Sequence, residues 1–106
     1  MTDALKHDTD KPRFDLLPAN ALFDLVEIYT FGARKYGDRN WEKGLSWGRI
    51  FGAIMRHLWA WWRGEENDAE SGFSHLAHAA WGCFTLLEYA KTHKELDDRC
   101  NPATPQ

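Results

Sequence analysis

The chain has 106 residues, of which 43% are hydrophobic and 14% aromatic, and 13 Lys and Arg stand against 16 Asp and Glu for a net charge of −3. The length fits one domain, residues 1–106, with a single core, and the aromatic content excludes a disordered chain, because disordered chains are poor in aromatic residues. The acidic balance excludes a protein that coats a nucleic acid polymer through charge, because such binding needs a surplus of Lys and Arg.

The first segment, residues 1–13, is polar and is expected to be a flexible end. It lacks the apolar core of a secretory signal. No later stretch has the length and apolarity of a membrane span. Cys83 and Cys100 are expected to remain free thiols in a reducing compartment. These features predict a cytoplasmic protein with no membrane partner.

The first expected helix covers residues 18–36. Pro18 suits the first turn of a helix, where its missing N–H leaves no hydrogen bond unmade. Apolar residues then recur at helical spacings of three and four, at Leu22, Leu25, Val26, Tyr29, Ala33 and Tyr36. The glycines and polar residues that follow predict a loop over residues 37–45.

The second expected helix covers residues 47–63, with Ser46 as its N-cap and Gly64 as its stop. His57 lies at the edge of its apolar stripe. That stripe consists of Trp47, Ile50, Phe51, Ile54, Leu58, Trp61 and Trp62. The opposite side of this amphipathic helix carries Arg49, Arg56 and Arg63.

The third expected helix covers residues 70–92 and is capped by Asp68 or Ser71. Its main apolar stripe consists of Phe73, Leu76, Ala80, Cys83, Phe84 and Leu87. A second stripe, roughly opposite, consists of His75, His78, Gly82, Thr85 and Tyr89. Because neither stripe is charged, we expect the histidine stripe to face a site, another subunit or both. The polar tail over residues 94–106 is expected to be flexible.

No segment has the pattern of a β-strand, so the fold class is predicted to be all-α: a small bundle of three main helices. Six Trp and six Phe are many for a monomer of this size. We therefore expect a homo-oligomer, a dimer or a tetramer, that buries part of the apolar surface.

Candidate metal ligands are concentrated between residues 56 and 78. The acidic stretch 65–70 supplies carboxylates, and His75 and His78 lie on one face of the third helix. Oxygen donors suit Mg²⁺ or Mn²⁺, and imidazole extends the range toward Mn, Fe, Co or Zn. Acidic stretches between helices are often only solvated linkers, so a metal site and a linker both remain open from the spacing alone.

A second candidate feature is the stretch 32–41, which combines cations, amides, aromatic residues and glycines. Such a segment can neutralise phosphates and stack a base. Alternatively, Arg34 and Lys35 only complement a helix C-terminus and Trp41 anchors the core.

With these residues in view, the chain resembles the phage family of dATP/dGTP diphosphohydrolases, small relatives of the MazG-like all-α nucleoside triphosphate pyrophosphohydrolases. The resemblance runs from about Lys11 to Glu88. Its motifs stand in the sequence as KPRFDLLP (11–18), GARKYG (32–37) with Asn40-Trp41, Arg56-His57, Gly64-Glu65, DAESG (68–72) and HLAHA (75–79).

The resemblance implies hydrolysis of a purine deoxynucleoside triphosphate, dGTP or dATP, to the monophosphate and pyrophosphate, which would adjust the nucleotide pool in a host cytoplasm. The expected metal ligands for Mg²⁺, Mn²⁺ or Co²⁺ are Glu65, Asp68, Glu70, His75 and His78. The expected catalytic residues are His57, Glu65, Lys35 and Arg56. The expected substrate-binding residues are Lys11, Asp15, Lys35, Tyr36, Asn40 and Trp41.

One departure from the wider MazG-like group concerns the metal ligands. That group uses Glu-x-x-Glu and Glu-x-x-Asp pairs on facing helices. This chain has Asp24-x-x-Glu27 and Glu65-x-x-Asp68, but His75 and His78 stand where an acidic pair is expected. Either the histidines replace carboxylates, or the metal lies at the 65–70 loop, or the hydrolase site has been lost.

Two further functions stay open. One is a non-catalytic helical interaction module that binds a host factor through its Trp-rich surface. The other is a bundle that binds a nucleotide without hydrolysing it. Loss of function on changing exposed Trp would indicate the first, and metal-dependent binding without product the second.

Overall fold

The computed structural model describes residues 4–100, which fold into three α-helices and three short 3-10 helices. The helices are α1 (Ala19–Tyr36), α2 (Trp47–Trp62) and α3 (His75–Thr92). The 3-10 helices are η1 (Phe14–Leu16), η2 (Asn40–Lys43) and η3 (Lys94–Leu96). The described part contains no strand, only an isolated bridge between Asn67 and Ser74, so the all-α prediction is confirmed.

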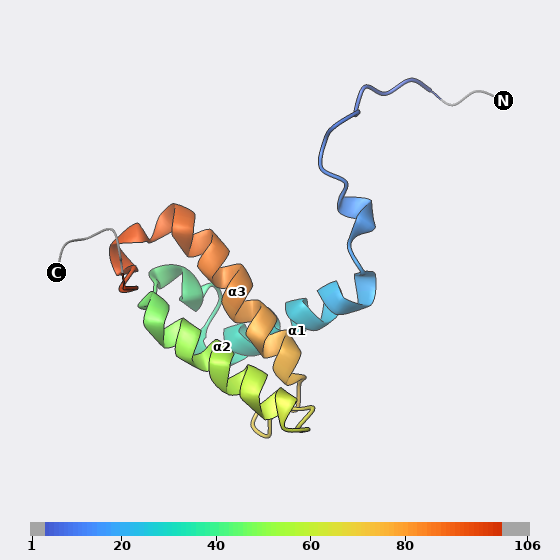
Figure 1. Cartoon of the computed structure of the whole chain (residues 1–106). Helices are drawn as coiled ribbons and strands as arrows, with labels where there is room; N and C mark the ends of the chain where they lie inside the picture. Colours follow the sequence, from blue (N-terminus) through green and yellow to red (C-terminus); the bar gives the residue numbers. More distant parts are fainter. Residues whose placement is uncertain (1–3, 101–106) are drawn as a thin grey trace.

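The core lies between α2 and α3, which run side by side, while α1 crosses them (Figure 1). Its buried cluster consists of Trp47, Ile50, Ile54, Ala79 and Tyr89. The predicted stripe of α2 is therefore confirmed in part, because Phe51 and Trp62 are exposed. None of the helices in the described part of the chain is long and apolar enough to cross a membrane.

The third helix differs most from expectation. It begins at His75 rather than residue 70, and its N-cap is Ser74, whose hydroxyl accepts a hydrogen bond from the Leu76 N–H at 3.0 Å. Neither Asp68 nor Ser71 caps it, because the chain before it forms a tight loop closed by the Asn67–Ser74 bridge.

The buried side of α3 is the one opposite its main apolar stripe. The histidine stripe is turned inward: His75, Gly82, Thr85 and Tyr89 are buried and His78 is half-buried. The apolar stripe is turned outward, with Leu76, Ala80, Cys83, Phe84 and Leu87 exposed. Cys83 and Cys100 are both free thiols, as expected.

Close contact between α2 and α3 depends on Gly82. A Cβ at this position would overlap the Ile54 side chain. We expect Gly82→Ala to lower the free energy of unfolding by about 1–3 kcal/mol, because overpacking forces the two helices apart. Gly32→Ala in α1 is the control, since no atom outside its own helix lies within 4 Å of the new Cβ. Equal changes in the free energy of urea unfolding for Gly82→Ala and Gly32→Ala would contradict the close contact at Gly82.

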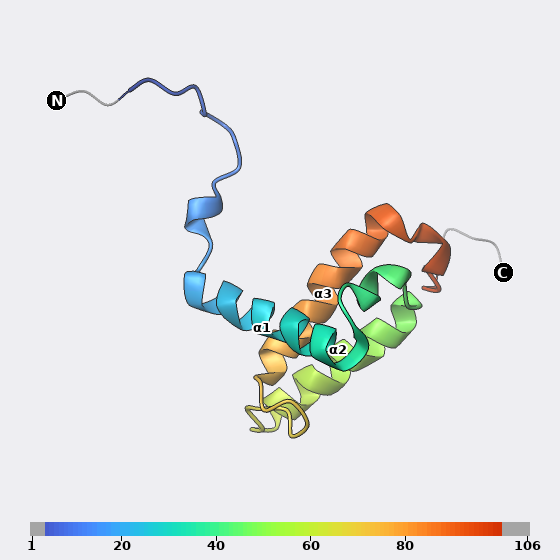
Figure 2. The same cartoon turned by 180° about the vertical axis from the view of Figure 1, so that it is seen from behind.

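The two ends of the chain behave differently. Residues 4–17 stand clear of the helices on one side (Figure 2), and the flexibility of residues 1–13 stays a prediction. Residues 94–100 instead contact α2: Leu96 packs against the core and Asp98 accepts a hydrogen bond from the Gly48 N–H at 2.8 Å. The rest of the two predicted flexible ends, residues 1–3 and 101–106, lies outside the described residues.

Candidate functional site

A pocket of about 790 Å³ lies between the C-terminal half of α1, the following loop, the end of α2 and the start of α3. Aromatic and apolar side chains form much of its wall. Its polar end holds His57, Asp68, Glu70, His78 and Lys35. This combination of an apolar wall with convergent polar groups is typical of a small-molecule site.

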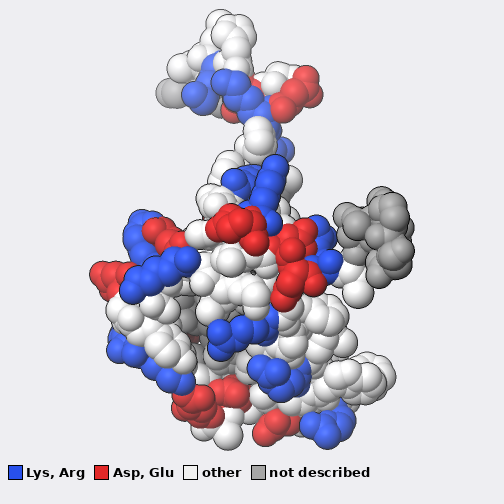
Figure 3. Space-filling model, turned by 90° about the vertical axis from the view of Figure 1, so that its left-hand side faces the viewer, with Lys and Arg blue, Asp and Glu red and all other residues white. Residues whose placement is uncertain are grey.

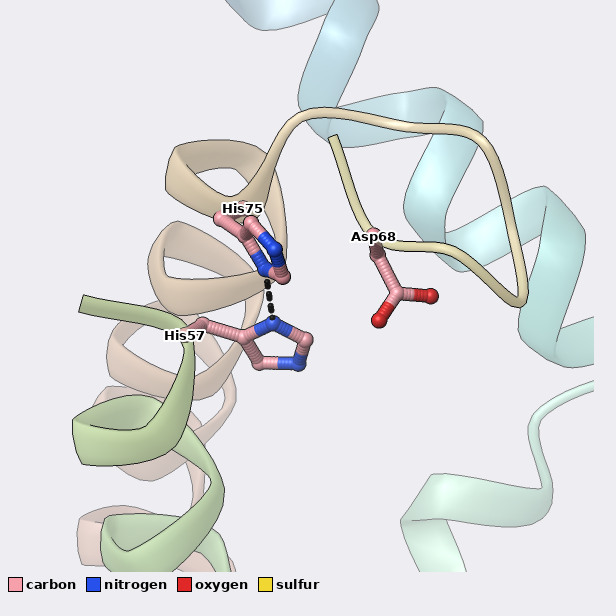
Figure 4. A group of neighbouring side chains, drawn as sticks. All are labelled: His57, Asp68 and His75. Atoms are coloured by element: carbon pink, nitrogen blue, oxygen red, sulfur yellow. Dashed lines mark hydrogen bonds between the residues drawn. The ribbon is translucent and has the colours of Figure 1, made fainter. Parts of the chain in front are cut away.

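Two histidines that are 18 positions apart meet at this end of the pocket. His57 projects from α2 and His75 from the first turn of α3, and their Nδ1 atoms are 2.8 Å apart (Figure 4). Asp68 reaches toward them from the loop. One ligand atom from each of the three residues lies within 4.8 Å of the others.

Glu65 sets the proton position on His75. Its Oε2 lies 3.0 Å from His75 Nε2, and a carboxylate can only accept, so Nε2–H donates. The neutral ring then presents the lone pair of Nδ1 toward His57, whose Nδ1–H donates. His75 is therefore held with its unprotonated nitrogen facing the other two members of the trio.

His78 and Asp68 are held by Ser71. The His78 Nε2 lies 2.7 Å from the Ser71 hydroxyl oxygen and 4.0 Å from the nearer Asp68 oxygen. The Ser71 N–H donates to that same Asp68 oxygen at 2.9 Å. The His78 ring also stacks on His57, with centroids 4.5 Å apart and planes 7° from parallel. Three imidazoles and one carboxylate thus form one connected cluster.

The surroundings favour neutral His57 and His78 rings and an ionised Asp68. Burial lowers the pKa of His57, and the His78 and His75 rings lower it further. Burial also lowers the pKa of His78, although Asp68 opposes the shift. Burial raises the pKa of Asp68, but hydrogen bonds from Ser71 outweigh it, so the net pKa lies below the usual value.

The trio His57, Asp68 and His75 fits a divalent ion. Two nitrogen ligands on one ion lie about 3 Å apart, close to the 2.8 Å between the two Nδ1 atoms, and an ion held by both would require the His57 proton to move to Nε2. Metal-bound imidazoles usually donate their other N–H to a carboxylate, as His75 does to Glu65. Two nitrogens and one oxygen suit Mn²⁺ or Co²⁺ better than Mg²⁺, which prefers oxygen ligands.

The other predicted ligands lie around this trio. Glu65 contacts His75 rather than the open pocket, and Glu70 pairs with the Lys35 ammonium from the end of α1. His78 lies against the trio through its ring stack. Lys35 also lies over the Tyr36 ring, 5.3 Å from its centroid. Of the five predicted metal ligands, Asp68, Glu70 and His78 therefore line the pocket, whereas Glu65 and His75 contact each other outside its lining.

The loop after α1 forms the opposite wall. Asn40 and Trp41 line the pocket, and Trp41 also stacks on Tyr89 in the core at 6.4 Å. Trp41 thus packs against the core and also forms part of the pocket wall, while its stacking on a base stays a prediction. Arg39 adopts a left-handed conformation, with φ of 56°, which turns the chain back toward the pocket.

Three predicted site residues lie away from the pocket. Arg56 is exposed on the outer side of α2, where it lines a shallow hollow with Trp59 and Arg63. Lys11 is exposed on the segment before α1, and Asp15, on the same segment, pairs with Arg13 at 2.7 Å. Within the described part of one chain, Lys11 and Asp15 make no hydrogen bond or ion pair with the histidine cluster, and the Arg56 side chain lines a different hollow although it is next to His57 in the sequence.

Sequence reasoning missed Ser71 and Trp81. Ser71 connects His78 to Asp68, and Trp81 forms part of the pocket wall. A serine within an acidic loop carries no distinctive signal. Trp81 lies on neither predicted stripe of α3, so only the packing of α1 could reveal its position.

The lowered histidine pKa values predict acid sensitivity. The unfolded chain binds protons near pH 6.5, where native His57 and His78 still resist protonation. The stabilising contribution of the two neutral rings should therefore be largest above about pH 6.5. The free energy of unfolding should then fall as the pH drops toward the lowered pKa values. Urea unfolding between pH 7.5 and 5 measures this slope.

The matched variant for this measurement is His78→Gln, which should give a smaller slope. The raised pKa of His93, caused by its hydrogen bond to Glu95, acts in the opposite direction. The pH slopes of the wild-type chain and the His78→Gln variant should therefore be compared with His93→Gln introduced into both. An unchanged slope in the His78 variant would contradict a buried neutral ring.

Comparison with known proteins connects this site to a family. Residues 1–99 match a family described as "dATP/dGTP diphosphohydrolase, N-terminal". A protein of Salmonella phage PMBT28 named dATP/dGTP diphosphohydrolase is 30% identical over 95 residues, which are 90% of this chain and 32% of the phage protein. The chain thus spans about a third of the length of this relative. No solved structure gives a significant match.

Proposed function

Because the chain belongs to the dATP/dGTP diphosphohydrolase N-terminal family, we propose that it hydrolyses dGTP or dATP to the monophosphate and pyrophosphate with a divalent metal ion. The relative that carries this activity in its name is about three times as long, so locating the reaction in this part is itself part of the proposal. The observation that supports it is the cluster of three imidazoles and Asp68 at the polar end of a pocket of nucleotide size.

His57, His75 and Asp68 would hold the ion, with Glu65 orienting His75. The ion would supply positive charge to the phosphates and lower the pKa of a bound water. We propose Mn²⁺ or Co²⁺ ahead of Mg²⁺, because imidazole donors favour them. Glu70 and His78 would lie next to the ligands without binding the ion. Glu70 forms an ion pair with Lys35, and His78 forms a hydrogen bond with Ser71.

The protein groups around the ion would divide the remaining tasks. His78, kept neutral by burial, could accept a proton at Nε2 from the Ser71 hydroxyl, which would in turn take one from water. Lys35 would contact a phosphate after exchanging its bond to Glu70. The wall formed by Tyr36, Asn40 and Trp41 would hold the base by stacking and amide hydrogen bonds.

We further propose a homo-oligomer, a dimer or a tetramer, in a host cytoplasm. The outward stripe of α3 supports it, since Phe84 is 55% and Leu87 67% exposed. Contiguous apolar surface of this kind marks an interaction site.

The test is a product assay by ion-exchange chromatography. The chain is incubated with each of the four dNTPs and GTP, with Mn²⁺, Co²⁺, Mg²⁺ or a chelator. We expect a purine monophosphate and pyrophosphate with Mn²⁺ or Co²⁺ and none with the chelator. No product with any ion would overturn the activity for this chain.

The second candidate is the helical interaction module. Trp59 is 57% and Trp62 71% exposed at the end of α2, which favours a partner-binding surface. If the assay gives no product, loss of partner binding in Trp59→Ala together with Trp62→Ala would select this function. Metal-dependent nucleotide binding without product would select the non-hydrolysing bundle.

A further inference from the structure

The pocket lacks available positive charge. Among the described residues, its lining contains two cations, and both are already paired: Lys35 with Glu70, and Arg39 with Glu42. The lining also contains the carboxylates Asp38, Asp68 and Glu70. A triphosphate carries several negative charges, so one chain with its ion offers it few free cations.

Unpaired cations lie on the segment before α1, residues 4–17, called here the arm. Every residue of the arm is exposed. Lys6 and Lys11 have no ion-pair partner between residues 4 and 100, whereas Arg13 is held by Asp15. Figure 3 shows the arm standing above the body with positive and negative side chains mixed along it.

The arm also exposes several large apolar side chains. Leu5 is 90%, Phe14 79% and Leu16 69% exposed. The first half of α1 continues this surface, with Leu22 42%, Phe23 64% and Val26 51% exposed. Side chains of this size gain about 1.5–3 kcal/mol each when fully buried, so a covering partner is strongly favoured.

The size of the chain's surface gives the same result. Its accessible area is 8852 Å², whereas a compact monomer of this mass exposes about 6,100 Å². Its radius of gyration is 17.7 Å, against about 13 Å for a compact domain of this length. The excess comes in large part from the extended arm, which stands clear of the helices (Figure 2).

We propose that the arm of one copy of this chain lies along the pocket of a second copy and places Lys11 at the phosphates of the bound nucleotide. This rests on the proposed function, since it assigns part of the same site to a partner subunit. A two-fold axis near Val26 makes the two α1 helices antiparallel, so that each arm leaves its own α1 beside the other chain's pocket.

The distances agree with this arrangement. Val26 forms one edge of the pocket, and Lys35 lies nine residues further along α1, a rise of about 13 Å. With the axis near Val26, Ala19 of one copy lies beside Ala33 of the other, and the eight residues from Lys11 to Pro18 can span up to about 26 Å, enough to bring the backbone of Lys11 near that end. The lysine side chain covers the remaining distance. Lys11 thus becomes the free cation that the single-chain pocket lacks.

Disulfide trapping tests the contact without depending on activity. In a background of Cys83→Ser and Cys100→Ser, chains carrying Lys11→Cys are mixed and refolded with chains carrying Asp38→Cys, at the pocket edge. We expect the mixed disulfide dimer to form at least about tenfold faster than with Arg49→Cys as the second chain. Arg49 is exposed on α2 and does not line the pocket.

Equal rates for the two pairs would overturn the proposal, and so would a monomeric chain in sedimentation. A double variant, Lys11→Cys with Asp38→Cys, that closes only within one chain would show that the arm serves its own pocket. If the trapped dimer forms but no dNTP is hydrolysed, the arm contact stands and the proposed function fails. If dNTPs are hydrolysed but the two disulfide pairs form at equal rates, the proposed function stands and the arm contact fails.

Subunit complementation supplies the catalytic readout. Lys11→Glu and Asp68→Asn should each be nearly inactive alone. In a refolded one-to-one mixture, half of the dimers are mixed and each has one intact site, so about a quarter of wild-type activity should return. No recovery on mixing would overturn the action of Lys11 in the partner's pocket.

Discussion

Ile50→Ala is expected to lower the free energy of unfolding by about 2–5 kcal/mol. Ile50 is 2% exposed and lies in the cluster with Trp47, Ile54 and Tyr89. Removing three carbons there leaves a cavity that α2 and α3 cannot close, because aromatic side chains fix their separation. Urea unfolding followed by circular dichroism measures the difference.

The neighbouring position gives a matched control. Phe51 belongs to the same apolar stripe in the sequence, yet it is 58% exposed. We therefore expect Phe51→Ala to change the free energy of unfolding by less than about 0.5 kcal/mol. A loss of stability as large as that of the Ile50 variant would show that Phe51 is buried in the folded protein, although it is exposed in the structure of one chain.

Asp68→Asn is expected to reduce the hydrolysis of purine dNTPs about 100-fold or more. Asp68 is the one carboxylate in the trio with His57 and His75, so its charge would dominate ion binding. Asparagine keeps an oxygen that can accept the Ser71 N–H, so the loop should keep its shape. Initial rates with Mn²⁺ and titration of Mn²⁺ binding both measure the effect.

Glu66→Gln is the control for this variant. Glu66 lies in the same loop and is exposed, and its side chain does not line the pocket. Its backbone carbonyl accepts the His75 N–H at 2.9 Å, a bond that the substitution preserves. Rates within about twofold of the wild type are expected. Equal losses in both variants would point to the general charge of the loop rather than to a site at Asp68.

Local patterns in the sequence determined where the first two helices lie. Helix α1 starts one residue later than expected and α2 ends one residue earlier, because Pro18 and Gly64 are strong local signals. The start of α3 differed by five residues. Asp68, Ser71 and Ser74 are all suitable caps, and only the loop hydrogen bonds decide among them.

The sequence predicted residues of a candidate site but not their arrangement. The residue types from 56 to 78 left a metal site and a solvated linker both open, and the structure gathers His57, Asp68 and His75 into one trio. The spacing could not show that Glu65 contacts His75 rather than the pocket. That distinction depends on the antiparallel pairing of α2 with α3, which sets which atoms face one another.

The sequence by itself determined an all-α chain and the three helical segments, because helical periodicity and turn residues act over a few positions. Only the tertiary structure decided which side of α3 is buried. Both sides of that helix are uncharged, so hydrophobicity alone would place Leu76, Phe84 and Leu87 inside. Gly82 instead allows α2 to approach the histidine side closely, and this close packing brings the imidazoles together while leaving the apolar side outward.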